Sequence, residues 1–185
     1  MAARNSRKDY SPDTYYHIYN RGVEKRLIFQ DEQDYAVFLS YLKTYLLPKD
    51  ENKLHQTLAN PNITCREREK ILQEIRLNNF NQEITLLSYC LMPNHFHLLV
   101  KQESSSGIDK FMNSLGVRYS MFFNKKYKRV GSLFQDVYKA VRVESEEQLL
   151  YLTSYIHRNP LEQSPASKED VLRAYTRYPS SYPEY

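Results

Sequence analysis

Two spacings of apolar residues separate strands from helices along this chain. Residues 15–19 (YYHIY) are aromatic and β-branched and precede an Asn-Arg-Gly turn, which predicts a short strand. Residues 31–45 carry apolar side chains three and four positions apart, which predicts an amphipathic helix. Pro48 ends this helix, because proline cannot continue it.

Residues 48–82 have a different character, because they are polar, charged and rich in Asn and Gln. Within them the sequence Thr64-Cys65-Arg66-Glu67 resembles a helix cap, and the apolar residues that follow keep helical spacing. We interpret this segment as a helical insertion between two strands.

A strongly apolar segment, residues 84–91 (ITLLSYCL), predicts a strand that is buried on both faces. A Met-Pro-Asn break follows, and residues 95–101 (HFHLLVK) predict the second strand of a hairpin. The sequence Ser-Gly-Ile-Asp at 106–109 predicts a capping box that opens a helix with an apolar stripe. Residues 133–143 predict one or two further strands, and a second capping box at Ser145 opens a last helix that runs to the proline at position 160.

The predicted order is β-α-insertion-β-β-α-β-α, which favours an α+β fold of ferredoxin-like type with an antiparallel-rich sheet packed against helices. A length of 185 residues fits one domain with an insertion. We therefore expect a domain at 1–165, containing the insertion at 48–82, and a tail at 166–185 that is rich in Tyr, Pro and Ser.

Composition narrows the class of protein. No stretch approaches the ~20 consecutive apolar residues that span a bilayer, and the basic N-terminal residues precede no apolar core of a signal peptide. We therefore expect no membrane association. The two cysteines form no CxxC pair, which argues against a thiolate metal site and fits a reducing cytoplasm.

The sharpest chemical feature is the pair His95 and His97. Alternate residues of a strand face the same side, so both imidazoles project together, away from Phe96 and Leu98. Two neutral imidazoles on a rigid strand form half of a divalent metal site. The alternative is a pair of half-buried histidines that hydrogen-bond to neighbouring groups.

The last helix supplies a second set of candidates. Tyr151, Tyr155 and Asn159 are four residues apart and share one face, provided that the proline after Asn159 leaves the helix intact. The Asn159 carbonyl oxygen suits Mg²⁺ or Mn²⁺ and completes a ligand set with His95 and His97. A free phenol, with a pKa of ~10, is a poor nucleophile, but beside such a cation Tyr155 can attack a phosphodiester.

The formal charge of +4 is modest, but the basic residues are clustered. A basic run with interleaved aromatic residues suits a phosphate backbone with stacking bases, whereas the same run can also be a solvated helix end. The cluster comprises Lys125, Lys126, Lys128 and Arg129, with Arg118 upstream.

Four segments together resemble the single-tyrosine HUH transposases, and most closely their REP-associated branch. The segment LMPNHFHLLV (91–100) is similar to their His-hydrophobic-His core, and YHIYNRG (16–22) to their opening strand. LTSYIHRNP (152–160) resembles the helix with their nucleophile, and YPSSYPEY (178–185) resembles a YPWSSY segment of that branch.

The resemblance implies an HUH ferredoxin-like fold and a metal-dependent endonuclease, in which His95, His97 and Asn159 hold Mg²⁺ or Mn²⁺. Tyr155 would cleave single-stranded DNA with hairpin or palindromic ends and remain linked to a 5′-phosphate. Rejoining the strands would give DNA transposition or mobilisation of REP elements. DNA contacts are expected from Arg21, Lys139 and the basic cluster. We expect a cytoplasmic, nucleoid-associated protein that is either a monomer or a homodimer.

Two other functions fit the same residues. A non-catalytic module could bind single-stranded DNA or RNA through stacking tyrosines and basic side chains. A rolling-circle initiator or relaxase uses a similar His pair with a tyrosine helix. The intact metal ligands and nucleophile argue against a pure binding module, which needs neither. If the Tyr155 hydroxyl and the ring nitrogens of His95 and His97 do not converge in space, the cleavage hypothesis weakens.

Overall fold

A four-stranded antiparallel sheet organises the molecule. The computed structural model describes residues 10–160 and 178–181. The strands lie in the order β2-β3-β1-β4 and comprise β1 (Thr14–Arg21), β2 (Ile84–Met92), β3 (His95–Gln102) and β4 (Lys139–Arg142). Strand β3 pairs with β2 through the predicted hairpin and with β1 on its other side. The α+β class and the antiparallel sheet are confirmed.

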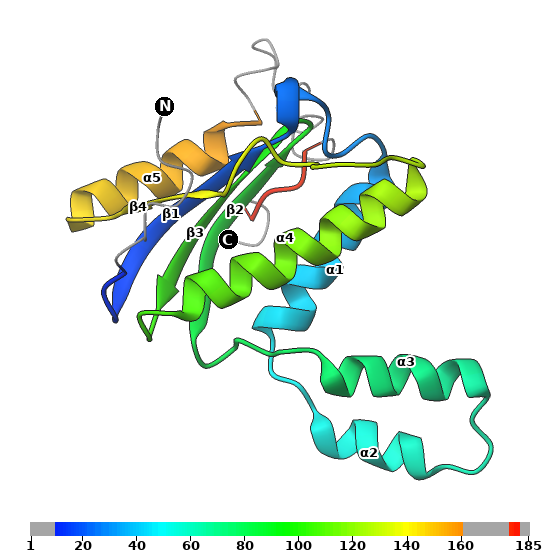
Figure 1. The fold of residues 1–185 in the computed structure, drawn as a ribbon. Helices are drawn as coiled ribbons and strands as arrows, with labels where there is room; N and C mark the ends of the chain where they lie inside the picture. Colours follow the sequence, from blue (N-terminus) through cyan, green and yellow to red (C-terminus); the bar gives the residue numbers. More distant parts are fainter. Residues whose placement is uncertain (1–9, 161–177, 182–185) are drawn as a thin grey trace, which may run out of the picture.

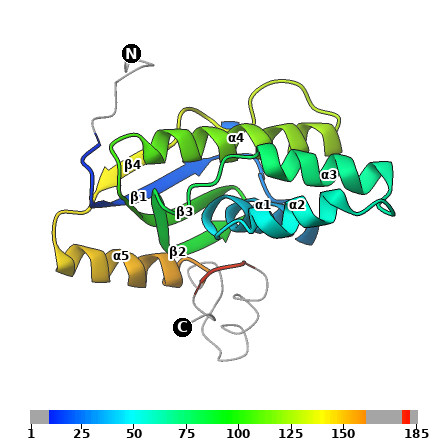
Figure 2. The same cartoon turned by 90° about the horizontal axis from the view of Figure 1, so that it is seen from below.

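Helices cover both faces of the sheet (Figure 1). Helices α1 (Glu32–Leu46) and α4 (Gly107–Lys126) lie against one face, and α5 (Glu146–Arg158) lies against the other, as the view from below shows (Figure 2). We call these the helix-pair face and the α5 face. In the part of the chain that the structure describes, no helix has the length and apolar character needed to cross a membrane.

The helix-pair face holds the larger core, and this core is strongly aromatic. Phe38 of α1, Phe96 of β3 and Tyr119 of α4 are buried there, with the Phe38 ring 5.4 Å from Phe96 and 5.0 Å from Tyr119 between centroids. Burying side chains of this size supplies much of the free energy that holds the two helices on the sheet.

The α5 face carries a smaller core, which holds the last helix in place. Its buried members are Cys90, Met92, Leu99, Val143, Ile156 and Tyr178. Residues 178–181 run along the edge of β2, where Leu91 N donates to the Pro179 carbonyl at 2.9 Å. The remainder of the predicted tail lies outside the described residues.

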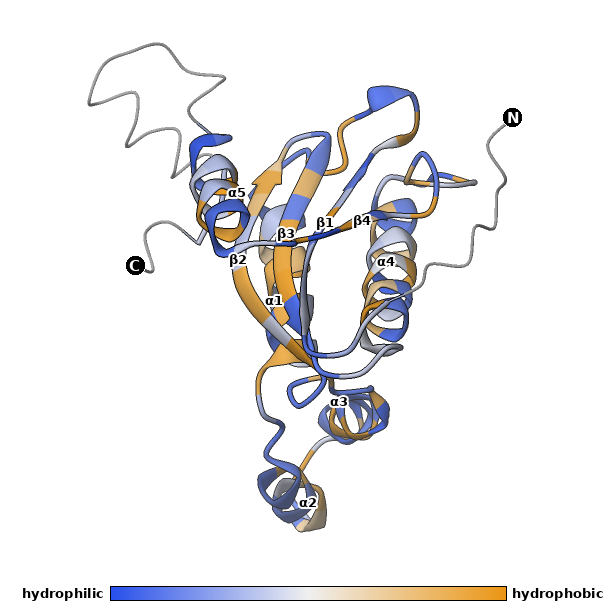
Figure 3. Cartoon of the chain, turned by 90° about the vertical axis from the view of Figure 1, so that its left-hand side faces the viewer, coloured by the Kyte–Doolittle hydropathy of each residue, from blue (hydrophilic) through white to orange (hydrophobic). Residues whose placement is uncertain are grey.

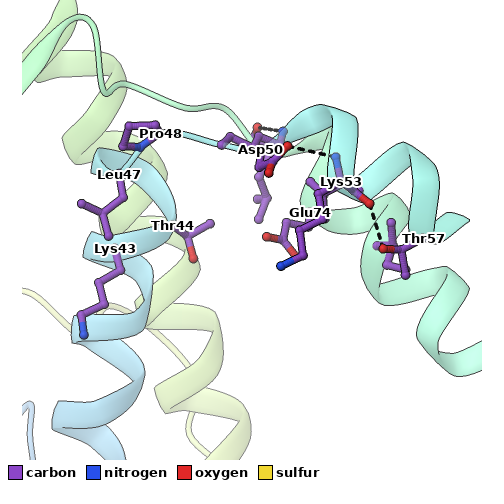
Figure 4. A pocket seen from close by; sticks show the side chains of 12 residues that line it. Lys43, Thr44, Leu47, Pro48, Asp50, Lys53, Thr57 and Glu74 are labelled. Atoms are coloured by element: carbon purple, nitrogen blue, oxygen red, sulfur yellow. Dashed lines mark hydrogen bonds between the residues drawn. The ribbon is translucent and has the colours of Figure 1, made fainter.

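The insertion is a helical hairpin that projects away from the sheet (Figure 3). It consists of α2 (Glu51–Ala59) and α3 (Cys65–Arg76), and the predicted cap at Thr64 forms a complete capping box with Glu67. Between α1 and the hairpin lies a pocket of about 440 Å³, lined by residues such as Lys43, Lys53 and Glu74 (Figure 4). This pocket lies at the end of α1 and α3, away from the histidine pair.

Of three local predictions, one is wrong, one is confirmed and one is confirmed in part. Ser106 makes no side-chain capping bond, so the predicted capping box is absent, and the Asp109 side chain accepts a hydrogen bond from Tyr138. Residues 133–143 contain one strand, β4, within the predicted one or two, and Phe134 adds a single bridge to Gly22. Ser145 caps the last helix as predicted, since its hydroxyl accepts from the Gln148 backbone at 3.2 Å. The Gln148 side chain accepts from the backbone of Glu144 rather than from that of Ser145. A short 3-10 turn at Val23–Lys25 follows β1.

Candidate metal and nucleic-acid site

Strand β3 presents His95 and His97 together on the α5 face, as the alternation of the sequence predicts. Their ring centroids are 5.1 Å apart. The intervening Phe96, together with Leu98 and Val100, joins the core of the helix-pair face. The burial of these three apolar side chains therefore fixes the direction in which both imidazoles point.

His95 is oriented by its neighbour in the hairpin turn. Its Nδ1 lies 2.7 Å from Oδ1 of Asn94. An amide oxygen can only accept, so His95 Nδ1 carries the proton and Nε2 keeps a lone pair. Burial lowers the pKa of His95, while a hydrogen bond with the Asn159 side chain raises it.

His97 is oriented by a third histidine, His17 of β1. His17 Nε2 lies 2.9 Å from His97 Nδ1, and the two ring planes differ by only 20°. His17 and His97 are 8% and 7% exposed. Burial lowers the pKa of His17 to about 4, and burial together with the nearby His17 and His95 lowers that of His97 to about 3. The imidazoles therefore stay neutral near pH 7, which is the form that binds metal.

Helix α5 brings Tyr155 and Asn159 to the same place. Asn159 keeps helical backbone angles despite the following proline, and its backbone N–H donates to the Tyr155 carbonyl at 3.1 Å. Its Nδ2 also donates to that carbonyl, at 3.0 Å, and its side chain lies within hydrogen-bond distance of the His95 ring. The Tyr155 ring lies 5.7 Å from the His97 ring, nearly perpendicular to it. Tyr151, predicted on this face, is 69% exposed and takes no part.

A pocket of about 760 Å³ opens beside these side chains. His95, His97 and Tyr155 line it together with Arg21 and Lys139, two of the predicted DNA-binding residues. The pocket is further lined by Tyr19, Asn20, Lys25, Asn94, Gln135, Asp136 and Val137. Its walls therefore combine a candidate nucleophile, two imidazoles and three cationic side chains within one chain.

The other predicted DNA-binding residues lie on α4 and just beyond it, on the helix-pair side of the sheet. Lys126 contacts Asp31 and the fully buried Asp34, each at 2.7 Å, and this ion pair ties α4 to α1. The Arg118 guanidinium lies 4.0 Å from the centre of the Tyr41 ring. Arg129 bonds to a neighbouring side chain, whereas Lys125 and Lys128 are exposed. The structure does not bring these five residues to the histidine pocket, so their role in binding DNA stays a prediction.

Two members of the site were missed by the sequence analysis. His17 and Tyr19 alternate on β1 and face the α5 side, where Tyr19 lies directly opposite His97 in the ladder. The Tyr19 ring is 5.9 Å from the His97 ring, and Lys139 Nζ lies 5.8 Å from the centre of the Tyr19 ring. Alternation in YHIYNRG could have grouped the two residues, but only the strand register places them beside His97.

The fit of a divalent metal ion depends on the donor atoms that converge beside Tyr155. Within residues 10–160 and 178–181, no three His, Cys, Asp or Glu side chains are arranged to hold a metal ion. The set that converges is instead two imidazoles and one amide, from His95, His97 and Asn159. The His95 Nδ1 proton bonds to Asn94, and Asn159 Nδ2 bonds to the Tyr155 carbonyl, while His97 Nδ1 is paired with His17. Ring nitrogens and an amide oxygen are a donor set that fits a cation with nitrogen and oxygen ligands.

Comparison with known proteins decides the family. The family described as "Transposase IS200 like" matches residues 55–159, which is more than half of the chain and includes the histidine pair and Tyr155. The chain belongs to the IS200-like transposase family. This membership confirms the resemblance that the sequence motifs carry and supports a transposase role. None of the curated proteins compared with the chain matches it.

One solved structure of 10% sequence identity shows the same fold. The chain is similar to a REP-associated tyrosine transposase bound to a REP hairpin, with a TM-score of 0.57 and 10% identity over 97% of this chain and 83% of that one. It is also similar to a putative transposase from Deinococcus radiodurans R1, with a TM-score of 0.42 and 14% identity over 83% of this chain and 96% of that one. The first likeness confirms the transposase fold of the sheet and its helices.

Proposed function

We propose that this IS200-like transposase cleaves and rejoins single-stranded DNA at hairpin-bearing ends, through a covalent 5′-phosphotyrosine on Tyr155 and with a divalent metal ion. The observation that carries the proposal is the position of the Tyr155 ring, 5.7 Å from that of His97 in one pocket. A module that only bound DNA would need neither this tyrosine nor a pair of neutral imidazoles beside it.

The chemical step assigned to Tyr155 is an exchange of one phosphodiester bond for another. The Tyr155 oxygen loses its proton to solvent and forms a bond to the phosphorus, while the bond from phosphorus to the 3′ oxygen breaks. The departing 3′ oxygen takes up a proton, and the 5′-phosphate stays on the protein. Attack by a second 3′-hydroxyl reverses the step, so the bond energy is kept for rejoining.

His95, His97 and Asn159 would hold Mg²⁺ or Mn²⁺ through two ring nitrogens and Oδ1 of the amide. When bound, such an ion polarises the phosphodiester and stabilises charge on the leaving oxygen. Helix α5 carries both Tyr155 and Asn159, so its packing against the sheet sets the nucleophile and one ligand together.

Arg21 and Lys139 would bind the phosphates that flank the cleaved bond, because they are the predicted cations that line the pocket. The relative of similar fold binds a REP hairpin, which supports a hairpin-bearing substrate here. All of the proposed groups come from one chain, which supports an active site that one copy completes by itself.

The test is to incubate the protein with Mn²⁺ and a panel of hairpin-bearing single-stranded oligonucleotides, and then to look for an adduct that survives denaturation. We expect an adduct for the wild-type protein, and loss of at least about a thousand-fold for Tyr155→Phe, because the nucleophile is removed. Tyr151→Phe is the matched control on the same helix, and it should react like the wild type.

Two outcomes would contradict the proposal. One is an undiminished adduct with Tyr155→Phe, and the other is the absence of any adduct across a broad panel of hairpin ends that the protein binds. The second outcome would instead favour a module that binds nucleic acid without cleaving it.

A further inference from the structure

The proposed cleavage step does not use the contact between His17 and His97. His17 lies in the middle of β1, where the ladder pairs it with Leu99 on one side and Val141 on the other. Its ring nitrogen Nε2 faces His97 Nδ1 at 2.9 Å, which is within the range of a hydrogen bond between two ring nitrogens. Both side chains are buried, so water cannot easily replace either partner.

The near-parallel rings favour a well-formed hydrogen bond. Their planes differ by 20° and their centroids are 5.1 Å apart, so an N–H in one ring plane can point along the in-plane lone pair of the other ring. Only one of the two nitrogens can carry the proton when both rings are neutral. The direction of this bond therefore fixes the tautomer of His97.

The hydrogen bond of His95 indicates which direction of the His17–His97 hydrogen bond suits a metal site. His95 Nδ1 must donate, because the partner is the carbonyl oxygen of Asn94, and this leaves Nε2 with the lone pair. If His97 donates from Nδ1 to His17 in the same way, both imidazoles present Nε2 as the free nitrogen. Two ligands with matched tautomers then share one cation.

We propose that His17 is a positioning residue, which accepts the Nδ1 proton of His97 and so holds the His97 ring with its Nε2 free to bind the metal. His17 itself binds no metal in this arrangement. The inference rests on the proposed function, since it assigns His97 to a metal site. Groups behind a metal ligand typically change metal affinity by about 10–100-fold when they are removed.

The first measurement reads the tautomer directly, without metal. Long-range ¹H–¹⁵N correlation spectra of the uniformly labelled, full-length protein in a chelator distinguish a protonated ring nitrogen from an unprotonated one. We expect His97 to carry its proton on Nδ1. A proton on Nε2 would overturn the inference, because His97 Nδ1 would then accept the proton of His17 Nε2, and His97 Nε2 would have no lone pair for the metal.

The second measurement is Mn²⁺ affinity, from the electron paramagnetic resonance signal of the free ion. His17→Phe keeps a flat ring but removes the acceptor, and we expect it to weaken binding by about 10–100-fold. His17→Gln places an amide oxygen where Nε2 stood, so it should restore most of the affinity. His55→Gln, on the exposed part of α2, is the control and should bind like the wild type.

The outcomes separate the two proposals. Wild-type affinity in His17→Phe, in a protein that binds Mn²⁺ normally, would overturn the positioning role and leave the proposed function intact. A wild-type protein that binds no Mn²⁺ would overturn the proposed metal site and, with it, this inference. If His17→Phe does not fold, the tautomer of His97 in the wild-type protein decides the question.

Discussion

Both faces of the sheet carry ring-bearing side chains, but those of one face form a core and those of the other line a pocket. On the helix-pair face, aromatic rings pack against one another, and its buried charge, Asp34, is matched by Lys126. On the α5 face, rings of histidine and tyrosine gather at a pocket with basic residues in its wall. A polar group that is buried and fully paired stabilises a fold, whereas one that borders a pocket with an acceptor atom left over can bind a ligand.

Neighbouring residues of β3 give the largest expected contrast between the faces. Phe96→Ala should lower the free energy of unfolding by about 3–5 kcal/mol, because it opens a cavity in the aromatic core. Cleavage per folded molecule should be unchanged. His97→Ala should cost only about 1–3 kcal/mol, for the lost hydrogen bond to His17, yet abolish metal-dependent cleavage.

Denaturant unfolding and the adduct assay, carried out on both variants under conditions where each is folded, check this contrast. If Phe96→Ala removes cleavage while His97→Ala retains it, it is wrong that the helix-pair face supplies stability and the α5 face supplies the active site.

Lysines on the two faces should also differ. Lys126→Met leaves Asp34 buried without its cation, so we expect a loss of about 3 kcal/mol of stability and little change in affinity for single-stranded DNA. Lys139→Met should leave stability unchanged, weaken DNA binding, and reduce the slope of log affinity against log salt by about 1.

Salt titrations of oligonucleotide binding, with unfolding curves for the same two variants, measure both effects. An equal loss of affinity in Lys126→Met would place DNA on the α4 side as well, as the basic cluster in the sequence suggests.

A smaller difference is expected in the response to acid. Because burial lowers the pKa of His17 to about 4, from 6.5 in the unfolded chain, only the unfolded chain takes up a proton between these values. In a chelator, the free energy of unfolding should therefore fall as the pH decreases through this window, by about 1.4 kcal/mol per pH unit for each histidine. The contribution is fully present above pH 6.5.

The helix-pair face should not respond in this window, since the hydrogen bond from Lys126 holds the pKa of Asp31 below its ordinary value. Unfolding curves at several pH values, for the wild type and His17→Phe, test this expectation. Equal slopes for the two proteins would count against it.

Much of the fold follows from local patterns, and so does half of the site. The alternation in HFHLLVK places Phe96 in a core and both histidines on the other face, because the strand period is two. The spacing of Tyr155 and Asn159 joins them on one helix face. The insertion was recognised from its composition and from the cap at Thr64.

The contribution of β1 could not be predicted, because it depends on the register between strands far apart in the sequence. Only the pairing of Tyr19 with His97 in the sheet brings His17 within hydrogen-bond distance of His97. The local sequence around Lys126 likewise does not reveal that this lysine forms an ion pair with the buried Asp34. A basic residue predicted from composition can therefore bind DNA or pair with a buried carboxylate, and tertiary contacts decide between the two.

The most direct test of the account is to locate the covalent bond between protein and DNA. After reaction with a hairpin-bearing oligonucleotide and Mn²⁺, the adduct is digested and its peptides are sequenced by mass spectrometry, with labels at either end of the DNA. We expect a 5′-phosphate linked to Tyr155, so that the 3′ label remains with the protein. A linkage to any other residue, or retention of the 5′ label, would contradict it.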